Sequence, residues 1–216
     1  MKYQAYLFDA YGTLFDVHSV KELLQEQYSS KAESISQDWR QKQIHYFMIR
    51  QLIDDYVPFD QITLWSLKDA LSENEVDDSP AVIEQLMQQY KKLAPYEEVS
   101  QMKERNKDKE LTIFSNGTHS MLEPLLEHNA LTSSFSLISA DEPKVYKPHP
   151  KAYEYAKKQV HKKKEEILFF SSNPWDIAGA ASYGFQTAWV NRSSSDWPNL
   201  GIKPDHILKN LTDLPQ

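Results

Sequence analysis

The chain has 216 residues and a formal net charge of -7, a length that allows one large domain or one core with an attached subdomain and argues against three domains. The acidic balance offers no broad basic face to nucleic acid, and the 0 cysteines exclude disulfides, thiolate nucleophiles and Cys-based metal sites. No apolar run approaches the roughly 20 residues of a membrane span, and Asp9 interrupts the position of a signal-peptide core, so we expect a cytoplasmic protein without a membrane partner.

The first predicted element is a strand. Residues 3–8, YQAYLF, form a short aromatic and aliphatic run that is followed by Gly12, which is typical of a buried strand with Asp9 at its carboxyl end. In an open α/β sheet, ligands bind at the carboxyl ends of the strands. Asp9 is therefore the first candidate functional residue, and Gly12 would allow a tight turn that presents it.

Helices are predicted for the long interval that follows, because no glycine occurs between Gly12 and Gly117. The stretches FDQITLWSLKDAL and PAVIEQLMQQYKKL repeat apolar residues at helical spacing, and Ser79 with Pro80 fits an N-cap followed by the first helical residue. The stretch QDWRQKQIHYFMIRQLIDDY is also predicted to be helical. Its expected apolar face consists of Trp39, Phe47, Leu52, Ile53 and Tyr56.

After about residue 98, short apolar runs alternate with helical stretches. LTIFSNG, FSLISAD, EILFFSSN and QTAWVNR are predicted strands, and helices are predicted at HSMLEPLLEHNA, HPKAYEYAKKQV and WDIAGAASYG. Alternating β and α units predict a parallel sheet with right-handed crossovers. The expected fold class is α/β, with a Rossmann-like core from residues 1–15 and 98–216 and a helical cap subdomain from residues 16–97.

Polar side chains follow several of these predicted strands. Taken alone, the serines and Asn116 are typical of turns or helix N-caps, Asp9 of a turn carboxylate, and Lys147 of a solvated lysine before a helix. Their recurrence at successive strand ends instead indicates one site that combines carboxylates, a cation and neutral hydrogen-bonding groups. The candidates are Asp9, Ser115, Asn116, Lys147, Ser171, Asn173 and Asp176.

The stretches DAYGTLFD, SNG, VYKP and SSNPWD, in this order and at these spacings, resemble the four motifs of the haloacid dehalogenase superfamily. More narrowly, they resemble the motifs of the type II L-2-haloacid dehalogenases. The resemblance covers essentially the whole chain, including a helical cap between the first and second motifs. It implies the Rossmann-like parallel core of that superfamily with an inserted helical cap.

Two motif positions separate dehalogenases from the phosphatases of the superfamily. Phosphatases carry a second aspartate, the general acid, two residues after the nucleophile, where this chain has Tyr11. Their fourth motif usually supplies acidic magnesium ligands, whereas here Ser171, Ser172 and Asn173 precede Asp176. This set is too poor in charge to favour Mg²⁺ strongly. The resemblance therefore implies a dehalogenase with no metal and no other cofactor.

The implied reaction is hydrolysis of short L-2-haloalkanoic acids to D-2-hydroxy acids and halide. Asp9 would displace the halide and form an ester, and water, deprotonated or positioned by Asp176, would hydrolyse that ester. Lys147 would stabilise negative charge on Asp9. The resemblance implies four supporting residues: Tyr153 to orient the cluster, Thr13 to support Asp9, and Ser171 with Asn173 to hold Asp176.

The resemblance also assigns residues to the substrate. Ser115 and the backbone N–H groups around Ala10, Tyr11 and Asn116 would bind the substrate carboxylate. Arg40 would accept the departing halide, with Asn116 and Phe59 beside it, although an arginine on an amphipathic helix is usually solvated. A mostly apolar wall would be completed by Gln41, Ile44 and Trp175.

Two other functions stay open at this point. One is a Mg-dependent small-molecule phosphatase of the same superfamily, and the other is a catalytically idle binding protein on the same fold. The expected partners are a small 2-haloacid and, because the family is often dimeric, a second copy of the chain. Two departures from the motifs stand out: His149 replaces a frequent aspartate, and Pro174 replaces a small residue.

Overall fold

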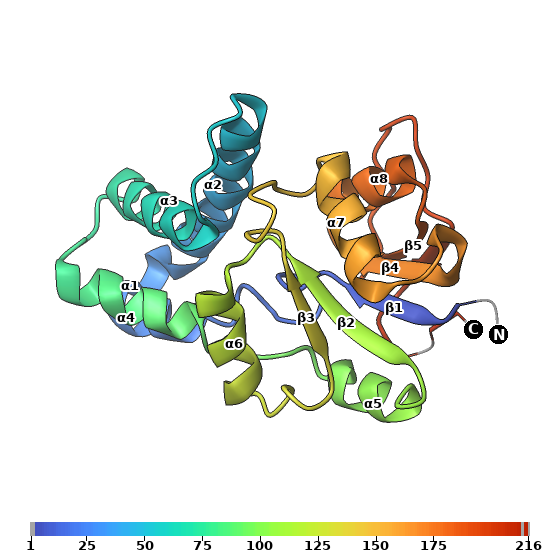
Figure 1. The fold of residues 1–216 in the computed structure, drawn as a ribbon. Coiled ribbons are helices and arrows are strands. Elements are labelled where there is room, and N and C mark those ends of the chain that lie inside the picture. The colour runs from blue at the N-terminus through green and yellow to red at the C-terminus, as the bar shows by residue number, and fades with distance from the viewer. Residues whose placement is uncertain (1–2, 213, 216) are drawn as a thin grey trace.

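The centre of the fold is a parallel β-sheet, shown in Figure 1, and the computed structural model describes residues 3–212, 214 and 215. In these residues the sheet has six strands in the order β3-β2-β1-β4-β5-β6. The strands are β1 (Ala5–Phe8), β2 (Glu110–Ser115), β3 (Ser136–Ser139), β4 (Ile167–Ser171), β5 (Gln186–Val190) and β6 (His206–Leu208). The predicted α/β class with a parallel sheet is confirmed. The short edge strand β6 was not predicted.

Strand β1 lies between β2 and β4, which explains its continuous apolar sequence. Leu7 is level with Thr112 of β2 and with Phe169 of β4, and every residue of β1 is buried. Successive side chains of a strand point to opposite faces of the sheet. A strand that is covered on both faces therefore needs apolar residues throughout.

Helices cover the two faces of the sheet. One apolar cluster joins Tyr6 and Phe8 to α5 (Glu98–Arg105) and α6 (His119–His128). A second cluster joins Ala5 and Leu7 to α7 (Pro150–Val160) and α8 (Pro174–Tyr183). Neighbouring residues of β1 belong to different clusters because successive side chains of a strand point to opposite faces of the sheet.

Four further helices lie between β1 and α5 in the chain and beside the carboxyl ends of the strands (Figure 1). They are α1 (Lys21–Tyr28), α2 (Ala32–Leu52), α3 (Phe59–Glu73) and α4 (Pro80–Tyr90). Buried polar contacts join them: the Trp39 indole donates to the Thr63 carbonyl at 2.9 Å, and Tyr90 donates to Gln43 at 2.9 Å. Short 3-10 helices occur at Ser29–Lys31 and Lys164–Glu166. None of the helices in this described part of the chain combines the length and apolar character that crossing a bilayer requires.

The apolar face predicted for α2 is wrong near the carboxyl end of the helix. Trp39 and Phe47 are buried, but Leu52 is 84% exposed and Ile53 is 58% exposed. At about 3.6 residues per turn, Leu52 lies on the opposite side of the helix from Trp39, and Ile53 already follows the end of the helix. The apolar face was therefore extended one turn too far.

Candidate active site

The ends of β1, β2 and β4 bring polar side chains to one edge of the sheet. Asp9 directly follows β1, and Ser115 and Ser171 are the last residues of β2 and β4. Gly12, at φ +86°, turns the chain back after Asp9, and its N–H donates to the Phe15 carbonyl at 2.8 Å. This left-handed conformation favours glycine, as the sequence led us to expect.

The Asp9 carboxylate lies at the centre of this edge and is almost completely buried. Its Oδ1 accepts a hydrogen bond from Lys147 Nζ at 3.0 Å. Its Oδ2 accepts from Asn173 Nδ2 at 2.8 Å, from Thr13 Oγ1 at 3.1 Å and from Ser171 Oγ at 3.4 Å. Both oxygens of this buried carboxylate are therefore held in place by donors, which a buried charge requires.

Lys147 is completely buried and uses all three of its N–H donors. It donates to Asp9, to Asp176 Oδ2 at 2.7 Å and to the Phe114 carbonyl at 2.9 Å. Burial would lower the pKa of the ammonium, but the charges of Asp176 and Asp9 outweigh burial and raise it. The ammonium therefore remains charged and bridges two carboxylates.

Asp176 is the second carboxylate of this cluster and is also completely buried. Besides Lys147, it is bound by the Tyr153 hydroxyl, which donates to Asp176 Oδ1 at 2.7 Å. Burial raises the pKa of Asp176 to about 6, although the Lys147 ammonium opposes this shift. Gly179, on the next turn of α8, lets Tyr153 approach, because a Cβ there would lie 2.6 Å from the Tyr153 hydroxyl oxygen.

One predicted contact is wrong. Ser171 and Asn173 were expected to hold Asp176, but their side chains donate to Asp9 instead. The reason is the geometry of the strand end: Ser171 ends β4, which lies next to β1, whereas Asp176 is in the first turn of α8 and faces α7.

Arg40 reaches this site from α2. Its Nη2 donates to the Tyr11 carbonyl at 3.2 Å and to Asn173 Oδ1 at 3.3 Å. Arg40 and Ile44 line a cavity of about 320 Å³ that also touches Gly12 and Asn173. The guanidinium therefore lies between the neighbours of Asp9 and a space large enough for a small ligand.

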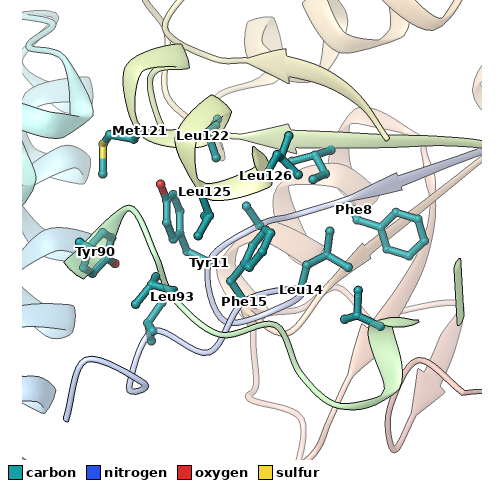
Figure 2. Packing of buried hydrophobic residues seen from close by; sticks show 14 of the residues in the cluster. Phe8, Tyr11, Leu14, Phe15, Tyr90, Leu93, Met121, Leu122, Leu125 and Leu126 are labelled. Carbon is teal, nitrogen blue, oxygen red and sulfur yellow. The ribbon is translucent and has the colours of Figure 1, made fainter. Parts of the chain in front are cut away.

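An aromatic cluster joins helices α2, α3 and α4 to Tyr11 and Trp175. The Tyr11 ring lies 5.8 Å from the Phe59 ring and 5.4 Å from the Tyr90 ring, and the Trp175 ring lies 5.3 Å from that of Phe47. Figure 2 shows the Tyr11 ring packed among apolar side chains that include Met121 and Leu122 of α6. The Tyr11 hydroxyl and the Trp175 indole N–H are buried without a hydrogen-bond partner. Burial raises the pKa of the Tyr11 hydroxyl well above its usual range.

The remaining predicted substrate residues differ in whether the structure brings them to the site. Ala10 is buried, and its carbonyl accepts three backbone hydrogen bonds that close the turn after Asp9. The Ser115 hydroxyl accepts the Gly117 N–H at 3.1 Å. The Asn116 side chain is bound to the backbone of Lys147 by two hydrogen bonds, so it fixes the lysine loop. Gln41 is exposed and lies over a separate surface hollow with His45 and Met48, so the structure does not bring it to Asp9.

Both motif departures have local explanations. His149 is the N-cap of α7, and its Nδ1 accepts the Lys151 N–H at 3.2 Å, which an aspartate would also do. Pro174 is the first residue of α8, where its missing N–H costs no intrahelical bond.

Sequence reasoning missed two residues that contact the Asp9 loop. The Ser172 hydroxyl donates to the Gly12 carbonyl at 2.8 Å, and Arg192 donates to the carbonyls of Gly12 and Thr13. Both follow predicted strands, so the same strand-end rule that found Asp9 would have included them. In residues 3–212, 214 and 215, no group of three His, Asp or Glu side chains is placed to hold a metal ion.

The chain resembles known proteins over most of its length. Residues 3–184 match the family of haloacid dehalogenase-like hydrolases. The chain is 40% identical over 215 residues to (S)-2-haloacid dehalogenase 2 of Pseudomonas sp. (strain CBS-3), covering 97% of this chain and 93% of the relative. It is 37% identical over 207 residues to haloacetate dehalogenase H-2 of Moraxella sp. (strain B), covering 94% of this chain and 92% of the relative.

A solved structure resembles the fold over nearly its whole length. It is the L-2-haloacid dehalogenase from Xanthobacter autotrophicus with chloropropionic acid covalently bound. The TM-score is 0.90 and the identity is 32%, and the match covers 98% of this chain and 96% of that chain.

Proposed function

The chain belongs to the haloacid dehalogenase-like hydrolases, and from this premise we propose that it is a hydrolase of short L-2-haloacids, which it converts to D-2-hydroxy acids and halide. The observation that supports this most directly is the Asp9 carboxylate. It lies at the end of β1 with the Lys147 ammonium on one oxygen and three neutral donors on the other. A carboxylate held in this way can act as a covalent nucleophile, which divides one difficult displacement into two easier steps.

In the first step, we propose that an Asp9 oxygen attacks C2 of the haloacid from the side opposite the halogen. The new carbon–oxygen bond forms as the carbon–halogen bond breaks, its electron pair leaves with the halide, and the carbon is inverted. A halide needs no proton to leave. Tyr11 suits this chemistry, because the raised pKa of its buried hydroxyl makes it a poor acid.

In the second step, water hydrolyses the ester at the Asp9 carboxyl carbon. We assign Asp176 as the base or water-positioning group: it takes one water proton as the oxygen bonds to that carbon. This proton passes to the hydroxy acid when the ester bond breaks, and the second water proton is released when Asp9 ionises again. Lys147 stabilises the negative charge that develops, and Tyr153 orients Asp176.

Arg40 is the proposed site of the departing halide. Its hydrogen bonds to the Tyr11 carbonyl and to Asn173 Oδ1 go to neutral oxygens, so its positive charge is still available to an anion in the adjoining cavity. The other proposed substrate contacts are the backbone around Ala10 and Tyr11, Ser115, Asn116, and a wall from Ile44, Phe59 and Trp175. Gln41 would need to turn inward when substrate binds.

The cap and core assignments are part of the proposal. We assign residues 1–15 and 98–216 to the catalytic core and residues 16–97 to the cap. Helices α1 to α4 lie within the second range, and Asp9, Lys147 and Asp176 lie within the first. The reaction would then take place between the two parts, with Arg40 as the contribution of the cap.

We also propose that the enzyme is a cytoplasmic homodimer. Four large apolar side chains are exposed at the end of α2, just after it, and on α3, and we call these four residues the cap patch. It consists of Ile49, Leu52, Ile53 and Trp65, with exposures of 40%, 84%, 58% and 40%. A second copy of the chain would cover this surface. The 0 cysteines suit a reducing compartment.

The deciding experiment is a halide-release assay. EDTA-treated protein is incubated with the separate L and D enantiomers of 2-chloropropionate, and an aryl phosphate with Mg²⁺ is run in parallel. We expect chloride from the L enantiomer alone and without metal, because Lys147 already supplies the cation between the two carboxylates. Phosphate release that depends on Mg²⁺, without chloride release, would assign the chain to the phosphatases. Silence in both assays would favour an idle binding protein.

A further inference from the structure

The loop after β5 is bound to the loop after β1 by one side chain, Arg192. Its Nη2 donates to the Thr13 carbonyl at 2.8 Å, and its Nη1 donates to the Gly12 carbonyl at 3.2 Å. Its Nε and Nη2 both donate to Glu98 Oε1, at 2.9 Å and 2.7 Å. The guanidinium also lies 3.6 Å from the centre of the Tyr96 ring. One side chain thus joins three separate segments of the molecule.

Two of these segments are the connections between the core and the cap helices, and they also pair with each other. The Asp16 N–H donates to the Ala94 carbonyl at 2.8 Å, and the Tyr96 N–H donates to the Leu14 carbonyl at 3.0 Å. Arg192 binds the outgoing connection at Gly12 and Thr13. It binds the returning connection at Tyr96 and at Glu98, the first residue of α5.

A short series of hydrogen bonds leads from Arg192 to the nucleophile. The carbonyl that Arg192 binds most closely belongs to Thr13, whose hydroxyl donates to Asp9 Oδ2 at 3.1 Å. The Ser172 N–H donates to the same hydroxyl at 2.9 Å. The rotation of the Asp9 carboxylate therefore depends on where the backbone of Thr13 lies.

We propose that Arg192 is a positioning residue for the reaction, which holds the Gly12–Thr13 backbone so that Thr13 orients the Asp9 carboxylate toward the substrate carbon. This inference rests on the function proposed above. Arg192 does not touch Asp9, and its effect passes through Thr13. A small displacement of a nucleophile is costly, because attack requires the reacting atoms to be close and aligned.

The chemistry of the contact requires arginine. The planar guanidinium directs donors at two carbonyls and a carboxylate at once and stacks on an aromatic ring, which a lysine ammonium cannot reproduce. The Arg192 side chain is 22% exposed and the Glu98 side chain 15% exposed, so the pair is largely shielded from solvent.

The first test compares two arginine substitutions that preserve charge. Arg192→Lys should lower kcat by roughly 10- to 100-fold with little change in KM, because a misplaced nucleophile impairs the attack more than binding. The matched control is Arg50→Lys. Arg50 also binds a carboxylate and a carbonyl, both of Asp55, and lies over the Trp65 ring, but these contacts are on the cap away from Asp9. The kcat of Arg50→Lys should stay unchanged.

The second test is chemical rescue. Arg192→Ala would open a space beside the 320 Å³ cavity, which Arg192 already lines, so a small cation can enter. Millimolar guanidinium should restore much of the lost kcat in this variant, whereas equal concentrations of urea or of an alkylammonium salt should not. Guanidinium should have no such effect on Arg50→Ala. A general loss of folding would not be corrected by a ligand of this specific shape.

Hydrogen exchange tests the role of Arg192 independently of the proposed reaction, because the measurement does not require an active enzyme. The N–H groups of Asp16 and Tyr96 should exchange faster in Arg192→Ala than in wild type, and added guanidinium should slow them again. Normal kcat in Arg192→Lys and in Arg192→Ala, in an enzyme that does release halide, would overturn the positioning role. An inactive wild-type protein would overturn the proposed reaction. In that case, unchanged exchange of the Asp16 and Tyr96 amides in Arg192→Ala would also overturn the proposal that Arg192 holds the Gly12–Thr13 backbone.

Discussion

The Lys147 ammonium lies 2.7 Å from the Asp176 carboxylate, and neither side chain is exposed to solvent. Two charges buried together stabilise a protein only if they remain paired, because the cost of removing each from water is large. Lys147 also serves Asp9, so this one cation keeps two buried carboxylates in place. Folding and the proposed reaction therefore depend on the same contact.

Lys147→Met should destabilise the protein strongly and in a pH-dependent way. At pH 8 the free energy of unfolding should fall by about 3–5 kcal/mol, since two buried carboxylates lose their cation. Without the ammonium, the pKa of Asp176 would rise further in the folded state. A raised folded pKa of an acid penalises folding fully above the folded pKa, and the penalty declines as the pH falls from the folded toward the unfolded pKa. The loss should therefore be smaller at pH 5, as measured by urea unfolding.

The control for this prediction is Lys158→Met, which removes an exposed pair with Glu154 on α7. It should leave the free energy of unfolding nearly unchanged at both pH values, because exposed pairs contribute little. Equal losses for Lys147→Met at pH 5 and pH 8 would contradict the account of its buried charges.

The rate of hydrolysis should fall as the pH drops through about 6. The pKa of Asp176 is raised to about 6 by burial, so below this pH the group is protonated and cannot accept a proton from water. The measurement is kcat against pH, together with the amount of trapped ester found by mass spectrometry in acid-quenched samples. Ester should accumulate at low pH if hydrolysis is the step that fails. A kcat that stays constant down to about pH 4, the ordinary pKa of an aspartate, would exclude Asp176 as the base.

Two neighbouring buried tyrosines should respond oppositely to the loss of a hydroxyl. The Tyr11 hydroxyl has no hydrogen-bond partner, whereas the Tyr90 hydroxyl donates to Gln43 at 2.9 Å (Figure 2 shows both rings). Tyr11→Phe should raise the free energy of unfolding by about 1 kcal/mol, because an unsatisfied buried group is removed. Tyr90→Phe should lower it by about 1–3 kcal/mol, because the buried Gln43 Oε1 loses its donor.

The activity of the Tyr11→Phe variant provides a second measurement. Tyr11→Phe should retain kcat, since the proposed departure of halide uses no acid at this position. A large loss of kcat with normal stability would instead show that the Tyr11 hydroxyl contacts the substrate. Thermal unfolding of both variants, recorded at one pH, gives the sign of each stability change.

The sequence was sufficient to predict the site residues that follow predicted strands. Asp9, Lys147 and Asp176 could be placed together because each follows a predicted strand, and strand ends of a parallel sheet share one edge. The sequence could not assign partners within that edge: Asn173 binds Asp9 and not Asp176 because of the neighbouring positions of β1 and β4. Such contacts depend on strand order, which no local pattern encodes.

Cap residues were harder to predict. Leu52 looked like part of an apolar helix face, but it lies on the side of α2 opposite the buried Trp39 and is 84% exposed. Arg192 follows a predicted strand, so its position could have been selected, but its partners could not: they are the backbone carbonyls of Gly12 and Thr13, and the identity of those residues does not indicate the contact. Tertiary contacts of this kind become visible only in the folded structure.

The oligomeric state should depend on the cap patch. Leu52→Glu places a charge in its most exposed member and should convert a dimer to a monomer, as measured by light scattering during size-exclusion chromatography, because an unpaired charge cannot be buried at an interface. Ile207→Glu is the matched control, since Ile207 is 60% exposed but lies on the edge strand β6. It should leave the dimer intact. A monomeric wild type, or dissociation caused by Ile207→Glu alone, would rule out the cap patch as the dimer interface.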